Sequence, residues 1–214
     1  MTEEYQKINI PSKEELKEIM KNPGKIKGAG FKGEMEYVLE QKGQEGLKAV
    51  EAETERLGFP INYKQMKDTD WYPVGLRVVS LSAILNTFNW GIEELKEMGK
   101  AATKISFIMR FFMKYFISGE KIFRVGSPRI WDRYYLNAGE IETVTFERNR
   151  KDSHAIIRIK GLRLHPIYCH FISGFALGIT ALVEANIKNI NIKETKCMFR
   201  GDPYHEYLIR WNYY

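Results

Sequence analysis

Residues 140–160 read EIETVTFERNRKDSHAIIRIK, and this stretch decides the fold class. Apolar and polar side chains alternate over 140–148 and again over 154–160, which is the pattern of half-buried β-strands. The polar segment 149–153 between them is typical of a turn. The stretch therefore predicts an antiparallel hairpin with one face toward a core.

The segments before this hairpin have the spacing of helices instead. Apolar residues recur at three- and four-residue steps from 31 to 57, where Gly43 and Gly46 are expected to separate two helices. Further helices are predicted over 74–86, 91–98, 103–118 and 122–136 before the hairpin, and over 165–185 after it. Alternation returns over 187–194 and 206–211 and predicts two more strands. This order predicts an α+β fold, in which a helical layer packs on a small antiparallel sheet.

The first thirty residues have a different character from the rest of the chain. A helix is expected to begin at Pro11-Ser12, with Ser12 as its cap, and Gly28-Ala29-Gly30 is typical of a linker. We therefore predict a helical arm and linker over 1–30 and a single α+β domain over 31–214. The arm either packs on the domain or binds a partner.

Composition places the chain among ordinary globular proteins. It has 214 residues, of which 44% are hydrophobic and 28% charged, and its net charge is +6. The positive charge is spread along the chain and interrupted by acids, so nucleic-acid binding is not expected. Neither a signal peptide nor a run of about 18 apolar residues is found. We expect a cytoplasmic protein without a membrane span, whose two cysteines are thiols or metal ligands.

Both cysteines and two other potential ligands lie in the last quarter of the sequence. Cys197 and His205 stand four residues to either side of Gly201, so a hairpin turn centred there would place their side chains opposite each other. Glu194 precedes Cys197 by three residues, and Cys169 lies at the start of the preceding helix. Thiolate, imidazole and carboxylate are ligands of zinc, and four of them close a tetrahedral structural site.

Two considerations weigh against this interpretation. A regular strand would point Glu194 and Cys197 to opposite faces, so a bulge or the end of the strand must fall between them. Cysteine is also commonly buried without any function. On spacing alone, a metal site and two reduced core cysteines, Cys169 and Cys197, therefore have about equal weight.

Four motifs resemble the 4-vinyl reductase-like domain family. They are Tyr168-Cys169-His170, Gly174-Phe175, Glu194-Thr-Lys-Cys197 and Gly201-Asp202-Pro203-Tyr204-His205-Glu206-Tyr207, and the resemblance covers about 120–211. It implies a zinc site at Cys169, Glu194, Cys197 and His205. His205 departs from the family pattern, which usually has Cys there, and this puts the affinity and the geometry of the site in question. The implied fold is shared with haem-based nitric-oxide sensors and with TRAPP-type Golgi transport subunits.

The resemblance also implies a place for a ligand. In the sensory relatives the ligand lies between the helices and the sheet, close to the metal. Trp131 and Tyr135 are then the first candidates for the pocket, and Phe107, Phe111 and Tyr115 follow. Aromatic residues at helical spacing are, however, more often part of a core.

Structural zinc is the cofactor that we expect, and haem is not. The Tyr-x-Ser-x-Arg signature that holds haem carboxylates in the nitric-oxide sensors is not found in the sequence, and none of its four histidines is clearly placed as an axial ligand. A Gly-rich dinucleotide loop after a strand, an iron–sulfur cysteine pattern and a nucleophile–base pair are not found either. We therefore assign no catalytic residue, and a non-enzymatic role is favoured.

The sequence thus predicts a zinc-stabilised sensory or regulatory domain for a small hydrophobic or aromatic ligand. The first alternative is a reductase or another enzyme that acts on a hydrophobic or tetrapyrrole-like substrate. The second is a structural dimerisation module. We expect a homodimer, because the apolar segments 105–117 and 171–183 exceed what one small domain readily buries.

Overall fold

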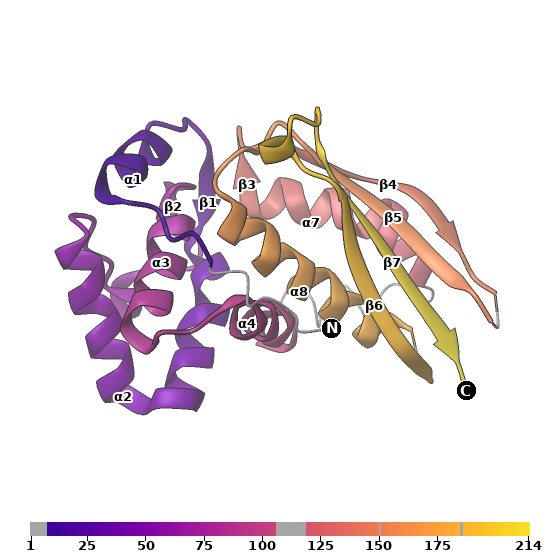
Figure 1. Cartoon of the computed structure of the whole chain (residues 1–214), viewed down its shortest axis with the longest axis horizontal. Helices are drawn as coiled ribbons and strands as arrows, with labels where there is room; N and C mark the ends of the chain where they lie inside the picture. The colour runs from indigo at the N-terminus through magenta and orange to yellow at the C-terminus, as the bar shows by residue number, and fades with distance from the viewer. Residues whose placement is uncertain (1–7, 106–118, 150, 185) are drawn as a thin grey trace, which may run out of the picture.

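The computed structural model describes residues 8–105, 119–149, 151–184 and 186–214, and two groups of elements lie side by side in it (Figure 1). The elements of the first group are α1 (Lys13–Met20), β1 (Lys25–Lys27), α2 (Lys32–Arg56), β2 (Trp71–Pro73), α3 (Leu76–Phe88) and α4 (Ile92–Ile105). Those of the second are α6 (Gly119–Lys121), α7 (Ser127–Tyr134), β3 (Tyr135–Leu136), β4 (Glu140–Glu147), β5 (Ser153–Lys160), α8 (Pro166–Val183), β6 (Ile187–Lys196) and β7 (His205–Tyr213).

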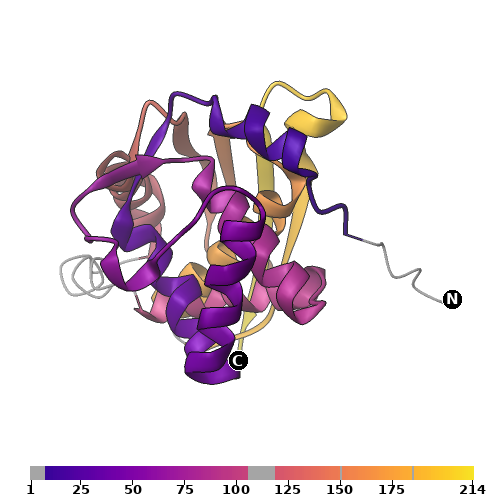
Figure 2. The same cartoon turned by 90° about the vertical axis from the view of Figure 1, so that its left-hand side faces the viewer.

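The second group is built on a four-stranded antiparallel sheet with the order β4-β5-β7-β6. Alternate residues of the two central strands are buried, namely Ala155, Ile157 and Ile159 from β5 and Tyr207, Ile209 and Trp211 from β7. This is the period of two on which the strand predictions depended, and all four strands are confirmed. Helix α8 runs beneath the sheet, and the helices of the first group lie beyond it (Figures 1 and 2). The predicted α+β fold is therefore confirmed.

The N-terminal residues are joined to the rest of the chain more closely than a linker would be. Ser12 Oγ accepts a hydrogen bond from the Glu15 N–H at 3.2 Å, while Glu15 Oε2 accepts one from the Ser12 N–H at 2.8 Å. This capping box confirms the predicted helix start. Gly28, however, is not in a linker, because it follows strand β1 and begins a short 3-10 turn that ends at Phe31. The division of the chain at residue 30 stays a prediction.

Strand β1 belongs to a second sheet that the sequence did not indicate. It pairs with β2 on one side and with β3 on the other, both antiparallel. Residues Trp71–Pro73 thus form a strand. These strands have two or three residues each and their partners are far apart in the sequence, so no local alternation could reveal them.

Helices α4 and α8 cross at the centre of the fold, and glycine residues allow their backbones to touch. The predicted helices over 91–98 and 103–118 correspond to one helix, α4, as far as Ile105, and residues 106–118 lie outside the described residues. A Cβ atom at Gly174 of α8 would lie 1.9 Å from the Lys96 carbonyl oxygen of α4, and one at Gly99 would lie 2.2 Å from the Phe171 carbonyl oxygen. The two backbones therefore touch at positions where only glycine fits.

We expect Gly174→Ala to lower the free energy of unfolding by about 2 kcal/mol, because the added methyl group must push α4 and α8 apart. Urea unfolding followed by circular dichroism measures this loss. Gly91→Ala is the matched control, since a Cβ there would meet only the Glu94 carboxylate at 3.5 Å, an ordinary contact. Equal stability of the Gly174 variant and the wild type would contradict the close crossing.

Helix α8 is long and apolar enough to cross a membrane by length and composition alone, but 61% of it is buried inside the fold. The sheet covers it on one side and α4 packs against it on another. Because its apolar surface is covered in this way, we interpret α8 as the core helix of the domain.

Candidate metal centre and the adjoining cavity

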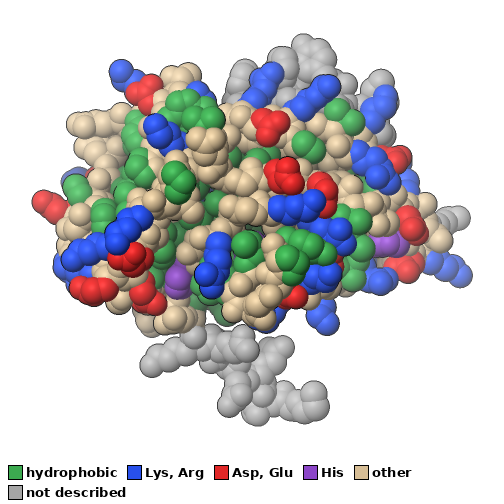
Figure 3. Space-filling model, turned by 90° about the horizontal axis from the view of Figure 1, so that it is seen from above, with side chains coloured by type: hydrophobic (Ala, Val, Ile, Leu, Met, Phe, Trp, Pro, Cys, Tyr) green, Lys and Arg blue, Asp and Glu red, His purple; other side chains and the backbone are tan. Residues whose placement is uncertain are grey.

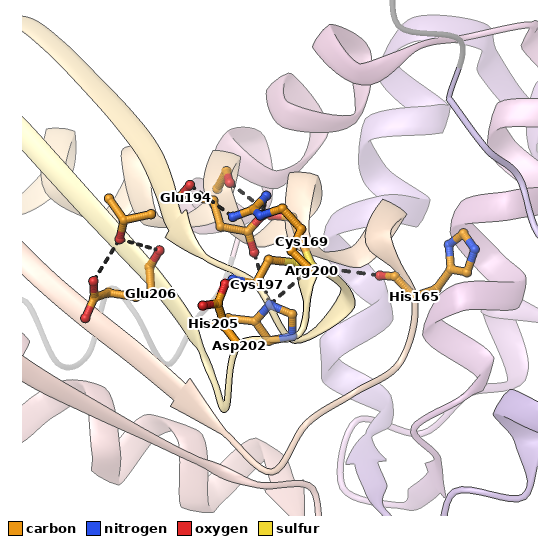
Figure 4. Close-up of polar contacts among 10 residues, drawn as sticks. His165, Cys169, Glu194, Cys197, Arg200, Asp202, His205 and Glu206 are labelled. Atoms are coloured by element: carbon orange, nitrogen blue, oxygen red, sulfur yellow. Dashed lines mark hydrogen bonds and ion pairs between the residues drawn. The ribbon is translucent and has the colours of Figure 1, made fainter.

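Four potential metal ligands meet at the end of the sheet where the β6–β7 hairpin passes over the start of α8 (Figure 4). They are Cys169 from the first turn of α8, Glu194 from β6, Cys197 just beyond β6 and His205 from the start of β7. One ligand atom from each lies within 4.8 Å of all the others. The four residues predicted from the sequence thus come together in space, and metal binding by them stays a prediction.

An irregularity in β6 brings Glu194 and Cys197 to the same side. Glu194 pairs with Tyr207 but Lys196 pairs with Glu206, so the register shifts between Glu194 and Lys196. This is the bulge that the sequence required if both side chains were to face one site. Without it, Glu194 would point away from Cys197.

The turn between the two strands is fixed by its own hydrogen bonds. Asp202 Oδ2 accepts a hydrogen bond from the Cys197 N–H at 2.8 Å, and the Cys197 carbonyl accepts from Arg200 and Asp202. Gly201 has φ of 91°, a conformation that favours glycine. On the helix side, Pro166 occupies the first turn of α8, and His165 Nδ1 accepts a hydrogen bond from the Ile167 N–H at 3.3 Å. His165 is thus a helix cap, and the turn and the cap together set the positions of Cys197 and Cys169.

Polar contacts already link the four side chains. His205 Nδ1 lies 3.0 Å from Glu194 Oε1 and 3.6 Å from Cys169 Sγ. Cys169, Cys197 and His205 are buried, while Glu194 is partly exposed. Arg200 Nη1 lies 3.5 Å from Glu194 Oε2 at the outer edge. A cation placed among these atoms would have sulfur, nitrogen and oxygen donors on several sides.

Burial and the neighbouring groups shift the pKa values of three of the four side chains. Burial raises the pKa of both Cys169 and Cys197, and the nearby Glu194 carboxylate raises them further. Burial acts most strongly on Glu194 and would raise its pKa, but the hydrogen bonds from His205 and Cys197 and the nearby charge of Arg200 together outweigh it, so the pKa is lowered. A divalent cation would favour both thiolates and offset the negative charge.

A large cavity lies between the four-stranded sheet and the helices, and α8 contributes to its wall. Its volume is about 760 Å³, within the range of ligand sites. Its wall includes the predicted residues Trp131 and Tyr135, whose rings stack at 4.2 Å between centroids. Their role as ligand contacts stays a prediction. The other predicted pocket residues, Phe107, Phe111 and Tyr115, lie outside the described residues.

The sequence prediction missed the contribution of α8 and α3 to this wall. Phe171, Phe175 and Ile179 line the cavity at four-residue spacing along one face of α8. This stripe is visible in the sequence, but it cannot be told from a core stripe without the cavity beside it. Arg77 of α3 also lines the cavity, although it lies in an apolar helix.

Surface charges of both signs are mixed. In the view from above, Lys and Arg side chains alternate with Asp and Glu (Figure 3). On the four-stranded sheet, Arg158 pairs with Glu206 at 2.7 Å and Lys160 with Glu142 at 2.9 Å. These two basic residues are therefore offset by acids on neighbouring strands.

Comparisons with known proteins identify the fold. No sequence-family profile matches the chain, and no curated protein matches it significantly. Among solved structures, an H-NOX protein from S. oneidensis in the Fe(II)NO ligation state matches with a TM-score of 0.64 and 15% identity, over 87% of this chain and 99% of that one. A mutant H-NOX protein from K. algicida, in the Fe(II) unliganded state, matches with a TM-score of 0.61 and 14% identity, over 87% and 97%.

This likeness shows that the chain has the fold of H-NOX proteins, and it corrects one prediction. Haem was not expected from the sequence, yet the structures that share this fold contain Fe(II) centres, and another similar structure, with a TM-score of 0.57, concerns heme redox potential and porphyrin distortion. The prediction against haem is therefore wrong. It depended on a short signature and on histidine positions, and neither reports the overall fold.

Proposed function

We propose that this chain is a small-molecule sensor domain that holds an apolar ligand in the cavity between its helices and its sheet. The observation that carries the proposal is the cavity itself, about 760 Å³ in volume and lined mostly by apolar and aromatic side chains. The fold it shares with H-NOX proteins supports the same role. Trp131 and Tyr135 are the aromatic contacts of the ligand in this proposal.

A bound metal ion, with zinc as the first candidate, is the second part of the proposal. Cys169, Glu194, Cys197 and His205 offer the donor set of a structural zinc site, and four protein ligands leave no open position for catalysis. Helix α8 carries Cys169 in its first turn and cavity residues in its later turns. The ion would thus hold the end of the helix that forms one wall of the ligand site.

Haem is a second candidate for the ligand, because H-NOX structures share the fold. Among the described lining residues, Tyr134 and Tyr135 are the only side chains of a type that ligates haem iron. The Tyr135 hydroxyl hydrogen-bonds to that of Tyr168, and burial raises the pKa of Tyr135, which disfavours the tyrosinate form that ligates iron. If haem binds, it supplies the gas-binding iron, while this chain supplies an apolar enclosure. Absorbance in the Soret region after incubation with hemin tests this candidate.

Several finer predictions rest on the sequence alone. Membership of the 4-vinyl reductase-like family is supported by the motifs around Cys169 and Gly201, and the likeness to H-NOX structures supports the wider fold. The homodimer and the cytoplasmic location also remain predictions. The proposed ligand site in the cavity does not depend on any of them.

Filling the cavity tests the proposed function. We expect Ala176→Phe, on the cavity wall, to weaken the binding of fluorene about tenfold or more in isothermal titration calorimetry, because the new ring occupies the space of the ligand. Ala181→Phe is the matched control, since Ala181 is exposed on the same helix. Native mass spectrometry of the purified protein checks for a bound apolar molecule. Failure of the wild type to bind fluorene, hemin or any copurified molecule would overturn the proposal.

A further inference from the structure

A buried arginine forms part of the cavity wall. Arg77 belongs to α3 and is 2% exposed, which is rare for this residue type. Its guanidinium lies 4.6 Å from the centre of the Phe171 ring and 5.4 Å from that of Phe31. Such an arginine is held in place by the surrounding structure and has a fixed direction for each of its N–H groups.

The charge of Arg77 is already balanced within the protein. Its Nη1 contacts Oε1 of the fully buried Glu34 and donates a hydrogen bond to the Gly30 carbonyl at 2.6 Å. Ser80 Oγ donates a short hydrogen bond to the other oxygen of Glu34. The pair is therefore neutral as a whole, and a further negative charge beside it would be buried without a partner.

One donor of this arginine has no acceptor. The Nε–H of Arg77 is buried and finds no hydrogen-bond partner among the described residues. A buried donor without a partner costs free energy, and native proteins rarely leave one in this state. Because Arg77 lines the cavity, a molecule bound there can supply the acceptor.

We propose that the ligand is an uncharged, planar aromatic molecule with one carbonyl-type oxygen, which accepts a hydrogen bond from Arg77 Nε. The inference rests on the proposed function and specifies the ligand class for the same cavity. A planar aromatic ligand suits this cavity because Trp131 and Tyr135 supply aromatic rings to its wall, on which such a molecule can stack. The absence of charge on the oxygen that Arg77 contacts follows from Glu34, which already balances Arg77.

Two matched compounds and one conservative variant test the hydrogen bond. Fluorene and 9-fluorenone share their ring system and differ by one carbonyl. Arg77→Lys keeps a positive charge for Glu34 but places a methylene where Nε stands. We expect the preference for 9-fluorenone over fluorene, measured by calorimetry as a ratio of dissociation constants, to fall about tenfold in this variant, since a hydrogen bond to a charged donor is lost. The difference in hydration between the two compounds is the same for both proteins, so it cancels when the ratio of the wild type is compared with that of the variant.

The charge argument has its own test in Glu34→Gln, which keeps an oxygen for Ser80 but removes the negative charge. We expect fluorene-2-carboxylate to bind the wild type about tenfold more weakly than 9-fluorenone, and this gap to close in the variant because Arg77 is then free to pair with the acid. Should either variant fail to fold, the double variant Glu34→Gln/Arg77→Met, which holds no buried charge pair, replaces it and should lose the carbonyl preference.

The outcomes separate this inference from the proposed function. The inference would be overturned if the ratio of the dissociation constants of fluorene and 9-fluorenone were the same in the wild type and in the Arg77→Lys variant. If both proteins still bound fluorene, the cavity would remain a ligand site. Tighter binding of the carboxylate than of the ketone by the wild type would also overturn it. If the wild type binds neither fluorene nor 9-fluorenone, both the inference and the proposed binding of aromatic ligands in the cavity are refuted.

Discussion

Replacing Cys197 with alanine is expected to release the metal ion and to lower the melting temperature by about 10 °C. Structural zinc contributes directly to folding free energy, and loss of one thiolate from four ligands removes most of its affinity. The domain has a separate hydrophobic core, so it stays folded at moderate temperature. A loss of about 3 to 4 kcal/mol corresponds to roughly 10 °C for a domain of this length.

Elemental analysis and differential scanning calorimetry measure the two effects together. The wild type should contain about one zinc ion per chain, and a chelator should lower its melting temperature toward that of the Cys197→Ala variant. The controls are two histidine variants: His205→Ala should lose the metal, whereas His170→Ala, beside Cys169 but outside the ligand group, should keep it. A metal-free wild type with the same stability as the Cys197 variant would refute the site.

Glu34→Ala is expected to lower the free energy of unfolding by about 3 to 5 kcal/mol, because it leaves the charge of Arg77 buried without a partner. The Ser80 hydroxyl also loses its acceptor, and Tyr63, which hydrogen-bonds to Ser80 at 2.6 Å, is next in the same network. Guanidinium unfolding measures the loss. Glu40→Ala, at an exposed position of the same helix, should change stability by less than about 0.5 kcal/mol.

A double variant separates the charge from the packing. Glu34→Leu/Arg77→Met replaces both partners with apolar side chains, and we expect it to be more stable than Glu34→Ala because no buried charge remains. If Glu34→Ala alone were as stable as the wild type, the ion pair would contribute nothing, and the charge balance inferred for the cavity would lose its basis.

The elements that the sequence predicted correctly are those with a local cause. The alternation over 140–160 marks β4 and β5 because each strand exposes one face, and the Ser12 capping box lies within four residues. Glu194 and Cys197 are three residues apart, so a regular strand would point them to opposite faces, and this spacing indicated the register shift in β6. In each case the residues that decide the structure are close together in the chain.

The features that the sequence did not reveal depend on distant partners. Strand β1 pairs with residues of β2 and β3, which lie more than 40 and more than 100 positions away in the sequence. Arg77 lies in an otherwise apolar helix, and this contrast can be read from the sequence. Its partner Glu34, however, belongs to another helix, and the cavity beside the Nε–H of Arg77 is formed only in the folded structure. Such pairings require the three-dimensional fold.

The position of β7 between β5 and β6 determines when the four-stranded sheet can form during synthesis on the ribosome. Strand β7 follows α8 and β6 in the chain, yet it pairs with both of its neighbours, so the sheet stays in separate pieces until β7 has emerged. At typical rates of synthesis this interval is about a few seconds. During that time the side of α8 that the sheet later covers has no complete cover.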